Sequence, residues 1–158
     1  MNKALRCIGA IILCELAGIL GTIFTTSQIQ TWYLTELILP SFAPPNWLFG
    51  PVWTILYALM GISLFLVWEQ KKRNKEWQGA ITIFFVQLFL NAIWTPIFFG
   101  MHALGFAFGV IIAMWLAIVL TIIVFYRQKK VAGYLLIPYL LWVSFASVLN
   151  GAIWYLNR

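Results

Sequence analysis

Apolar positions fill five long runs of this chain, and polar positions gather in the segments between them. A helix needs about 20 consecutive apolar residues to cross a hydrocarbon core of about 30 Å, and every run is long enough. We therefore predict five membrane-spanning helices, over Ala4–Thr25, Trp47–Trp68, Trp77–Phe99, Leu104–Tyr126 and Val131–Leu156. Because only the connection 26–46 is long, we expect one domain over 1–158. It is an all-α integral membrane protein, a five-transmembrane-helix bundle with one long loop between its first two helices.

The composition excludes an ordinary soluble domain, because 63% of the residues are hydrophobic and only 9% are charged. The first apolar run resembles a signal peptide, since Lys3 and Arg6 lie close to its start. However, Glu15 interrupts this run, the run continues to Phe24, and no small-residue cleavage site follows. We therefore expect a retained first helix.

The net charge of +6 comes from basic residues in a few short segments. With five spans, nine of the ten Lys and Arg residues fall on one face of the membrane, and only Arg158 falls on the other. This asymmetry predicts an N-terminus in the cytoplasm and a C-terminus outside, in a bacterial cell membrane. Anionic lipid headgroups are the natural partners of these residues, so we expect no nucleic-acid partner. The nine residues are Lys3, Arg6, Lys71, Lys72, Arg73, Lys75, Arg127, Lys129 and Lys130.

The segment Pro40–Gly61 has the features of a rigid loop that leads into an aromatic helix. Three prolines within six residues hold the backbone extended, and Trp53 and Tyr57 then follow one helical turn apart. Such a loop and helix are suited to form the roof and one wall of an apolar cavity. Two interpretations hold for Trp32 and Tyr33 in the preceding segment: an aromatic anchor at the membrane interface, or a lid whose rings reach into the cavity.

The third and fifth predicted helices carry polar and aromatic residues at membrane depth. Gln87, Asn91 and Trp94 lie on one stripe of the third helix, because they are four and three residues apart. Amides in a hydrocarbon core are costly without hydrogen bonds, so these two either join helices or orient a ligand. The fifth helix presents a broad face that contains Trp142, Ala146, Leu149 and Asn150.

Glu15, the two cysteines and a stripe of small residues complete the sequence-level candidates. Glu15 is the one carboxylate well inside a predicted span, where it either marks a functional path or packs between helices as a protonated or hydrogen-bonded carboxyl. Cys7 and Cys14 are too far apart to form a disulfide, and with no histidine or further cysteine beside them we predict no metal site. Small residues along the fourth helix indicate close packing, within the bundle or between subunits, and predict a homodimer. They are Gly105, Gly109, Ala113 and Ala117.

Three blocks of sequence, Trp32–Gly61, Gln87–Gly100 and Pro138–Asn157, resemble the translocator protein and tryptophan-rich sensory protein family, also called TspO/MBR or peripheral benzodiazepine receptors. The resemblance implies a five-helix bundle whose pocket opens towards the 26–46 loop. It also implies binding of porphyrins and other tetrapyrroles, of sterols in some members, and of isoquinoline carboxamide or benzodiazepine ligands. No cofactor is required, but a porphyrin or haem-type ligand is expected.

The ligand contacts follow from the motif positions and from the helical stripes. By motif position they are Tyr33, Trp53, Asn91, Trp94, Trp142 and Ala146. The stripes add Tyr57, Gln87, Leu149 and Asn150. We expect Trp53 and Trp142 to flank a planar ligand, Asn91 to donate a hydrogen bond to it, and Tyr33 to close over it from the loop. Residues 149–158 also satisfy the loose consensus proposed for cholesterol binding.

The leading functional hypothesis is a membrane receptor or regulator that binds a planar hydrophobic ligand, most naturally a tetrapyrrole. A tetrapyrrole transporter is the second hypothesis, although the chain lacks two repeated halves and has one intramembrane carboxylate for ion coupling. The third is light- and oxygen-dependent degradation of protoporphyrin, with Trp53 and Trp142 as candidate electron or radical partners. The sequence has no nucleophile–base pair and no Gly-rich phosphate loop, so we assign no catalytic residue on other grounds. A purely structural scaffold, the fourth hypothesis, leaves the three blocks unexplained.

Overall fold

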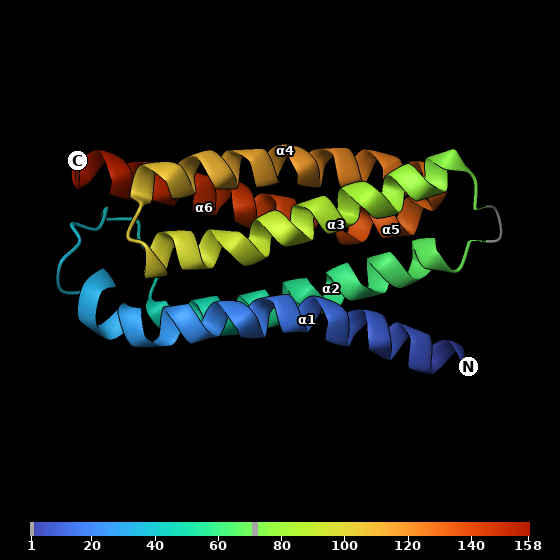
Figure 1. Cartoon of the computed structure of the whole chain (residues 1–158), viewed down its shortest axis with the longest axis horizontal. Coiled ribbons are helices and arrows are strands. Elements are labelled where there is room, and N and C mark those ends of the chain that lie inside the picture. Colours follow the sequence, from blue (N-terminus) through green and yellow to red (C-terminus); the bar gives the residue numbers. More distant parts are fainter. Residues whose placement is uncertain (1, 71–72) are drawn as a thin grey trace.

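The computed structural model describes residues 2–70 and 73–158, and within them five helical spans are long and apolar enough to cross a membrane (Figure 1). This confirms the predicted five-helix membrane bundle. In chain order the spans are Lys3–Tyr33, Asn46–Trp68, Lys75–Gly100, Leu104–Gln128 and Lys130–Leu156. Their ends lie within a few residues of the prediction, except that the first span continues to Tyr33 instead of ending at Thr25.

The spans combine α-helices with short turns of other helix types. In the first two spans, α1 (Lys3–Gln28) continues into a π-helical turn over Ile29–Tyr33, and a 3-10 turn over Asn46–Leu48 opens α2 (Phe49–Trp68). In the third, α3 (Lys75–Thr95) continues into a π-helical turn over Pro96–Gly100. The last two are α4 (Leu104–Gln128) and the pair α5 (Lys130–Leu135) and α6 (Ile137–Leu156).

Proline and asparagine set several of these boundaries. Pro96 has no N–H for the carbonyl four residues earlier, and α3 changes there into the wider π turn. Pro138 also lacks an N–H for the carbonyl four residues earlier. The last span is interrupted just before it, at Leu136 between α5 and α6. Asn74 caps the start of α3, since its Oδ1 accepts a 3.0 Å hydrogen bond from the Trp77 N–H.

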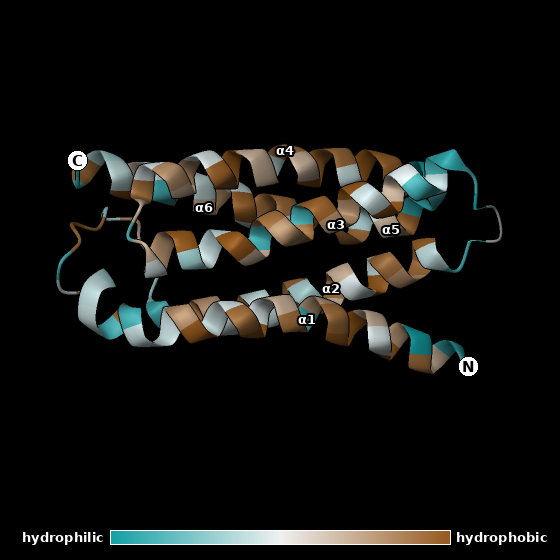
Figure 2. Cartoon of the chain, in the orientation of Figure 1, coloured by the Kyte–Doolittle hydropathy of each residue, from teal (hydrophilic) through white to brown (hydrophobic). Residues whose placement is uncertain are grey.

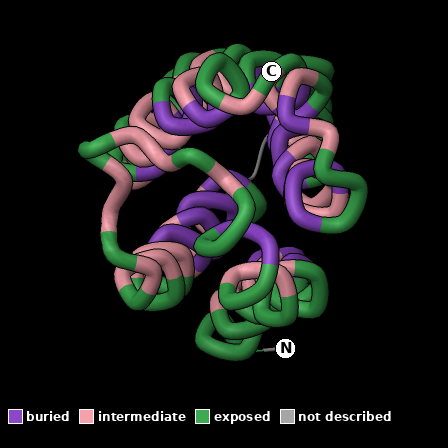
Figure 3. Tube along the Cα trace, turned by 90° about the vertical axis from the view of Figure 1, so that its left-hand side faces the viewer, coloured by how far each residue is buried: buried purple, intermediate pink, exposed green. Residues whose placement is uncertain are grey.

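The helices form a ring around a shared interior. α1 packs against α2 and α3, α3 packs against α4, and α4 packs against both α5 and α6. Contacts between α2 and α5 close the ring. Figure 3, a view along the bundle, shows buried residues turned towards the interior and exposed residues around the outside. The outer surface is the one that a membrane protein presents to lipid.

The two ends of the bundle differ in chemistry (Figures 1 and 2). The N-terminus and the connection between α2 and α3 lie at one end, which we call the basic end. The C-terminus and the 34–45 loop lie at the opposite end, which we call the loop end. At the basic end Arg6 Nη1 forms a 2.6 Å ion pair with Glu69 Oε1, which joins α1 to the end of α2. Lys71 and Lys72, also expected at this end, lie outside the described residues.

Two glycines allow α1 and α2 to cross closely. A Cβ added at Gly61 would lie 2.7 Å from the backbone nitrogen of Ile11, so main chain meets main chain at this point. A Cβ added at Gly18 would lie 2.8 Å from Cδ2 of the Tyr57 ring. The Tyr57 ring therefore fills the space that Gly18 leaves, and α1 fixes its position.

The small residues of α4 do not act as one stripe. Gly105 packs against the indole of Trp154, because a Cβ added there would lie 2.9 Å from the ring. Ala117 is buried within the bundle. Gly109 and Ala113 are exposed, and nothing lies within 4 Å of a Cβ added at Gly109. The middle of the stripe thus faces outwards, and the homodimer stays a prediction.

Candidate functional site: a cavity beneath the 34–45 loop

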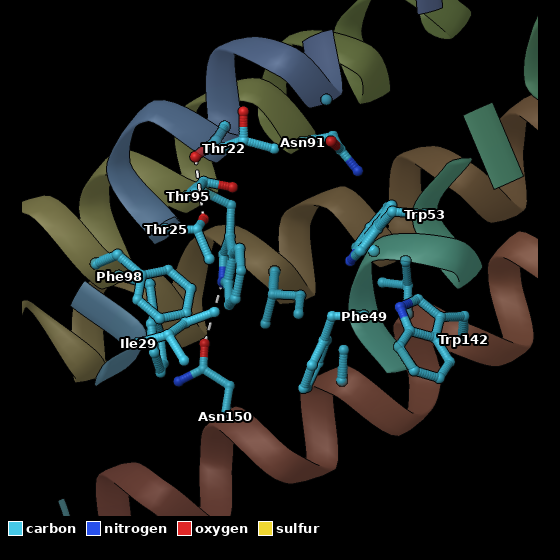
Figure 4. Close-up of a pocket in the computed structure, with 18 of the residues that line it drawn as sticks. Thr22, Thr25, Ile29, Phe49, Trp53, Asn91, Thr95, Phe98, Trp142 and Asn150 are labelled. Carbon is cyan, nitrogen blue, oxygen red and sulfur yellow. Dashed lines mark hydrogen bonds between the residues drawn. The ribbon is translucent and has the colours of Figure 1, made fainter. Parts of the chain in front are cut away.

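A cavity of about 360 Å³ lies between α1, α2, α3 and α6, in the half of the bundle nearer the loop end (Figure 4). This volume falls in the range of about 300–1,000 Å³ that small-molecule sites occupy in proteins. The lining is mostly aliphatic and aromatic, with a small number of polar groups. Such a composition suits a largely apolar ligand whose orientation is fixed by a few hydrogen bonds.

Aromatic pairs from α2 and α3 form two walls of the cavity. Trp53 stacks on Tyr57 with ring centroids 5.3 Å apart, and Trp94 stacks on Phe98 at 5.0 Å. In Figure 4, Trp53 and Trp142 both lie on the side away from Phe98. Both tryptophans line the cavity from neighbouring helices, α2 and α6, so their contact with a planar ligand stays a prediction. The second aromatic pair, Trp94 and Phe98, lies across the cavity from them.

Asn91 joins three helices at the inner end of the cavity. The Tyr57 hydroxyl donates a 2.5 Å hydrogen bond to Asn91 Oδ1, and Asn91 Nδ2 donates a 3.0 Å bond to the Tyr139 hydroxyl. Asn91 thus has the structural role that the sequence left open. Since a primary amide has two N–H groups and one is used here, the hydrogen bond from Asn91 to a ligand stays a prediction.

A second amide, Asn150, joins helices nearer the loop end. Its Oδ1 accepts a 3.2 Å hydrogen bond from Trp94 Nε1, and its Nδ2 donates a 3.1 Å bond to the Leu104 carbonyl. The indole of Trp94 is therefore held edge-on by α6, with its face free to contact the cavity. Asn150 acts mainly as a support for Trp94.

Two residues that line the cavity each carry a buried hydrogen-bond donor without a partner. The Tyr33 hydroxyl and Trp142 Nε1 are both buried, and neither forms a hydrogen bond with any residue that the structure describes. Buried polar groups are nearly always hydrogen-bonded, and an unpaired one costs about 1–3 kcal/mol. A ligand with hydrogen-bond acceptors at its edge would satisfy both donors.

The π turn after α1 directs Trp32 and Tyr33 into the protein. The Trp32 ring stacks on His102 at 3.9 Å with the planes 5° apart, and Tyr33 is only 4% exposed. His102 Nε2 also lies 3.1 Å from Gln28 Oε1. Tyr33 lines the cavity, as the lid interpretation expects, whereas Trp32 packs on His102 and is not part of the lining. Both side chains are buried, which argues against the interfacial anchor. Although His102 is exposed, it holds the lid against the α3–α4 turn.

One face of α1 also lines the cavity, a feature that the sequence analysis missed. Glu15, Thr22, Thr25 and Thr26 contribute to it. Steps of seven residues from Glu15 to Thr22, and of three and four from Thr22 to Thr25 and Thr26, are the signal that could have shown it. The hydroxyls of Thr25 and Thr26 donate to carbonyls of the preceding turn, at 3.0 and 2.8 Å. These threonines therefore need no partner from another helix, which explains their tolerance at membrane depth.

The structure brings most of the predicted site residues together around this cavity. Those that line it are Tyr33, Trp53, Tyr57, Asn91, Trp94, Trp142, Ala146, Leu149 and Asn150. Gln87 is not part of the lining. It lies one turn of α3 closer to the basic end, is 1% exposed, and neither side-chain polar atom has a hydrogen bond within the described residues. Within the described residues, no group of three or more His, Cys, Asp or Glu is placed to hold a metal ion.

Comparison with known proteins agrees with this architecture. The pattern of the TspO/MBR family matches residues 10–156. The chain is 44% identical to the tryptophan-rich protein TspO of Chlorobaculum tepidum, with 99% of each chain covered. It is 44% identical to the tryptophan-rich protein TspO of Archaeoglobus fulgidus, with 97% of each covered. It is 34% identical to the human translocator protein, over 91% of this chain and 85% of the human one. These matches confirm the resemblance that the three sequence blocks suggested: the protein is a multi-pass membrane protein that belongs to the TspO/MBR family.

Proposed function

We propose that the protein is a membrane receptor or regulator that binds a planar, hydrophobic ligand of the tetrapyrrole class in the cavity beneath the 34–45 loop. The observation that carries the proposal is the combination of two stacked aromatic walls with two unpartnered donors, the Tyr33 hydroxyl and Trp142 Nε1. Aromatic rings contact a flat conjugated ligand favourably over its whole face.

The two donors narrow the chemistry of the ligand. Tyr33 O–H and Trp142 N–H both require an acceptor, such as a carboxylate or a carbonyl oxygen. A porphyrin with carboxylate side chains offers a flat body and acceptors at its edge. An isoquinoline carboxamide offers a smaller flat body and one carbonyl. A sterol offers a single hydroxyl and no aromatic face, so it fits this site less well.

The direct test is a binding screen on the purified protein in neutral detergent. Protoporphyrin IX, haem, an isoquinoline carboxamide and cholesterol are titrated while tryptophan fluorescence is recorded. We expect saturable quenching by the porphyrin, because Trp53 and Trp94 would lie against it. Product analysis in darkness and in light then separates receptor from enzyme: a receptor leaves the porphyrin intact, whereas a degrading enzyme gives a defined product. Absence of saturable porphyrin binding would refute the proposal.

We also propose that the basic end faces the cytoplasm and that the loop end, with the cavity, faces outwards. The charge distribution supports this orientation, since Lys and Arg in short connections remain on the cytoplasmic side. A homodimer is proposed on the exposed middle of α4.

A further inference from the structure

Glu15 is the one carboxyl among the described residues that line the cavity, and the same lining contains no Lys, Arg or His. It lies near the middle of its helix, about 18 Å along the axis from Lys3 and about 20 Å from Gln28 at 1.5 Å per residue. It is therefore placed at the depth of the hydrocarbon core. It is half-buried, one turn before Gly18, where α1 meets the Tyr57 ring.

The Glu15 carboxyl has no partner in the described part of the chain, where neither a hydrogen bond nor an ion pair reaches it. This contrasts with Glu69 at the basic end, which pairs with Arg6. A carboxyl at membrane depth is costly unless another group pairs with it, and such groups usually face a cavity or a functional path. Of the packed-carboxyl interpretations, the hydrogen-bonded one needs a partner on a neighbouring helix, and none lies among the described residues.

The face of α1 that carries Glu15 leads to an opening between α1 and α2. Ile19, Thr22 and Thr26 of α1 and Gly50 and Thr54 of α2 all line the cavity, and all of them are exposed. A Cβ added at Gly50 would have nothing within 4 Å. The two helices are in close contact at Gly61 and leave the cavity open to the side nearer the loop end. A ligand group can therefore approach Glu15 along this polar face.

We propose that Glu15 binds a nitrogen of the ligand that is positively charged or carries an N–H. The cavity would then select flat aromatic ligands with such a nitrogen over neutral or acidic ones of the same shape. The lining offers donors at Tyr33 and Trp142 and an acceptor at Glu15, so it recognises both ends of an amphipathic molecule. This inference rests on the proposed function, because it assigns the recognition chemistry within the same cavity.

The test uses three probes with the same four-ring aromatic body: 1-pyrenemethylamine, 1-pyrenemethanol and 1-pyrenecarboxylate. Affinities are measured by tryptophan quenching at pH 7 in a neutral detergent, with correction for probe that partitions into empty micelles. We expect the amine to bind about 10-fold more tightly than the alcohol, because its ammonium group would form a charge-assisted hydrogen bond with the Glu15 carboxylate. We expect the carboxylate to bind more weakly than the alcohol.

The Glu15→Gln variant should lower the preference for the amine to less than about twofold, because the affinity for the amine falls more than the affinity for the uncharged alcohol. Glu36→Gln is the matched control, because it removes the same charge from an exposed residue of the 34–45 loop and should keep the full preference. Glu15→Asp, which withdraws the carboxyl by one methylene, should keep a smaller preference and provides a second variant if the first does not fold.

Two results would overturn the inference: no preference for the amine in the unsubstituted protein, or an unchanged preference in Glu15→Gln. If the alcohol and protoporphyrin IX bind without any preference for the amine, the Glu15 inference fails and the proposed function stands. If neither the pyrenes nor protoporphyrin IX bind, both fail.

Discussion

Asn157 and Ile38 join the end of the last helix to the loop that covers the cavity. Asn157 Oδ1 accepts a 2.9 Å hydrogen bond from the Ile38 N–H, and Asn157 Nδ2 donates a 3.0 Å bond to the Ile38 carbonyl. Asn157 Nδ2 also donates a 2.8 Å hydrogen bond to the Ile153 carbonyl in α6. The side chain thus pairs with the loop as a neighbouring strand would. Together with the stack of Trp32 on His102, it holds the first half of the 34–45 loop in place.

Replacement of Asn157 by alanine should loosen the roof without unfolding the bundle. Both bonds to Ile38 are solvent-exposed, so their loss should cost about 1 kcal/mol in total. We expect faster hydrogen exchange at the Ile38 amide and ligand dissociation that is about three- to tenfold faster. Arg158→Ala is the control, because Arg158 lies over the Tyr155 ring. Equal dissociation rates in the two variants would show that the Asn157 contact does not retain the ligand.

Gly18→Ala tests the contact between α1 and the cavity wall. Alanine has the higher helix propensity, yet its Cβ would press on the Tyr57 ring and disturb the hydrogen bond to Asn91. We expect a loss of about 1–3 kcal/mol in unfolding free energy, typical of overpacking, and weaker porphyrin binding. Gly9→Ala on the same helix is the matched control, since nothing lies within 4 Å of its added Cβ. A Gly18→Ala protein as stable as Gly9→Ala would contradict this account of the wall.

The five spans could be predicted because the thickness of a bilayer fixes helix length, and hydropathy records it directly. Helical periodicity also predicted which way side chains point, but not the depth at which a cavity ends. Gln87 and Asn91 share one stripe of α3, and only Asn91 reaches the cavity. Tyr57 and Tyr139 bond to Asn91 from other helices, whereas Gln87 has no side-chain hydrogen bond within the described residues. Such contacts between helices do not follow from spacing along one of them.

The polar face of α1 illustrates a second limit. Threonine in a membrane helix bonds to its own backbone, so a row of threonines is compatible with lipid, packing or a cavity. Which of the three surroundings the threonines have depends on how α1 and α2 separate between their contact at Gly61 and the loop end. This separation is a property of the assembled bundle. Trp32 was ambiguous for a similar reason. A tryptophan near a helix end suits the membrane interface, and only the π turn and the position of His102 direct it inwards.

Trp53→Ala and Trp142→Ala should each weaken porphyrin binding several-fold, because an aromatic contact contributes about 0.5–1.5 kcal/mol beyond its buried area. The quench of tryptophan fluorescence should shrink in both. Trp142→Phe keeps one aromatic ring and removes the unpartnered N–H, so it should lose less affinity than Trp142→Ala. Trp47→Ala is the control, since Trp47 is 73% exposed and lies outside the lining. Unchanged affinity in folded Trp53 and Trp142 variants would place the ligand elsewhere.

Orientation in the membrane can be tested with single cysteines at Gln30, near the loop end, and at Glu76, in the first turn of α3 at the basic end; both are exposed. Cys14 is fully buried, so only Cys7 needs replacement in the background. In intact cells, an impermeant thiol reagent should label the cysteine at position 30. The cysteine at position 76 should react only after the membrane is opened, because the basic end is expected in the cytoplasm. Labelling of both from outside would reject the proposed topology.

The homodimer prediction can be tested without damage to the fold, because Gly109 and Ala113 are exposed in the single chain. Replacement of both by leucine adds volume where no neighbour lies within 4 Å of Gly109, so the monomer should keep its stability. If this part of α4 is the interface, the added side chains hold the two helices apart and the protein becomes monomeric. Size-exclusion chromatography with light scattering in detergent measures the change, and thermal unfolding confirms that the variant is folded.

Gly105→Leu is the contrasting variant: Gly105 packs on Trp154 inside the chain, so this substitution should lower stability. A folded dimer in the double-leucine variant would exclude this face of α4 as the interface and leave another helix, with α3 the next to test.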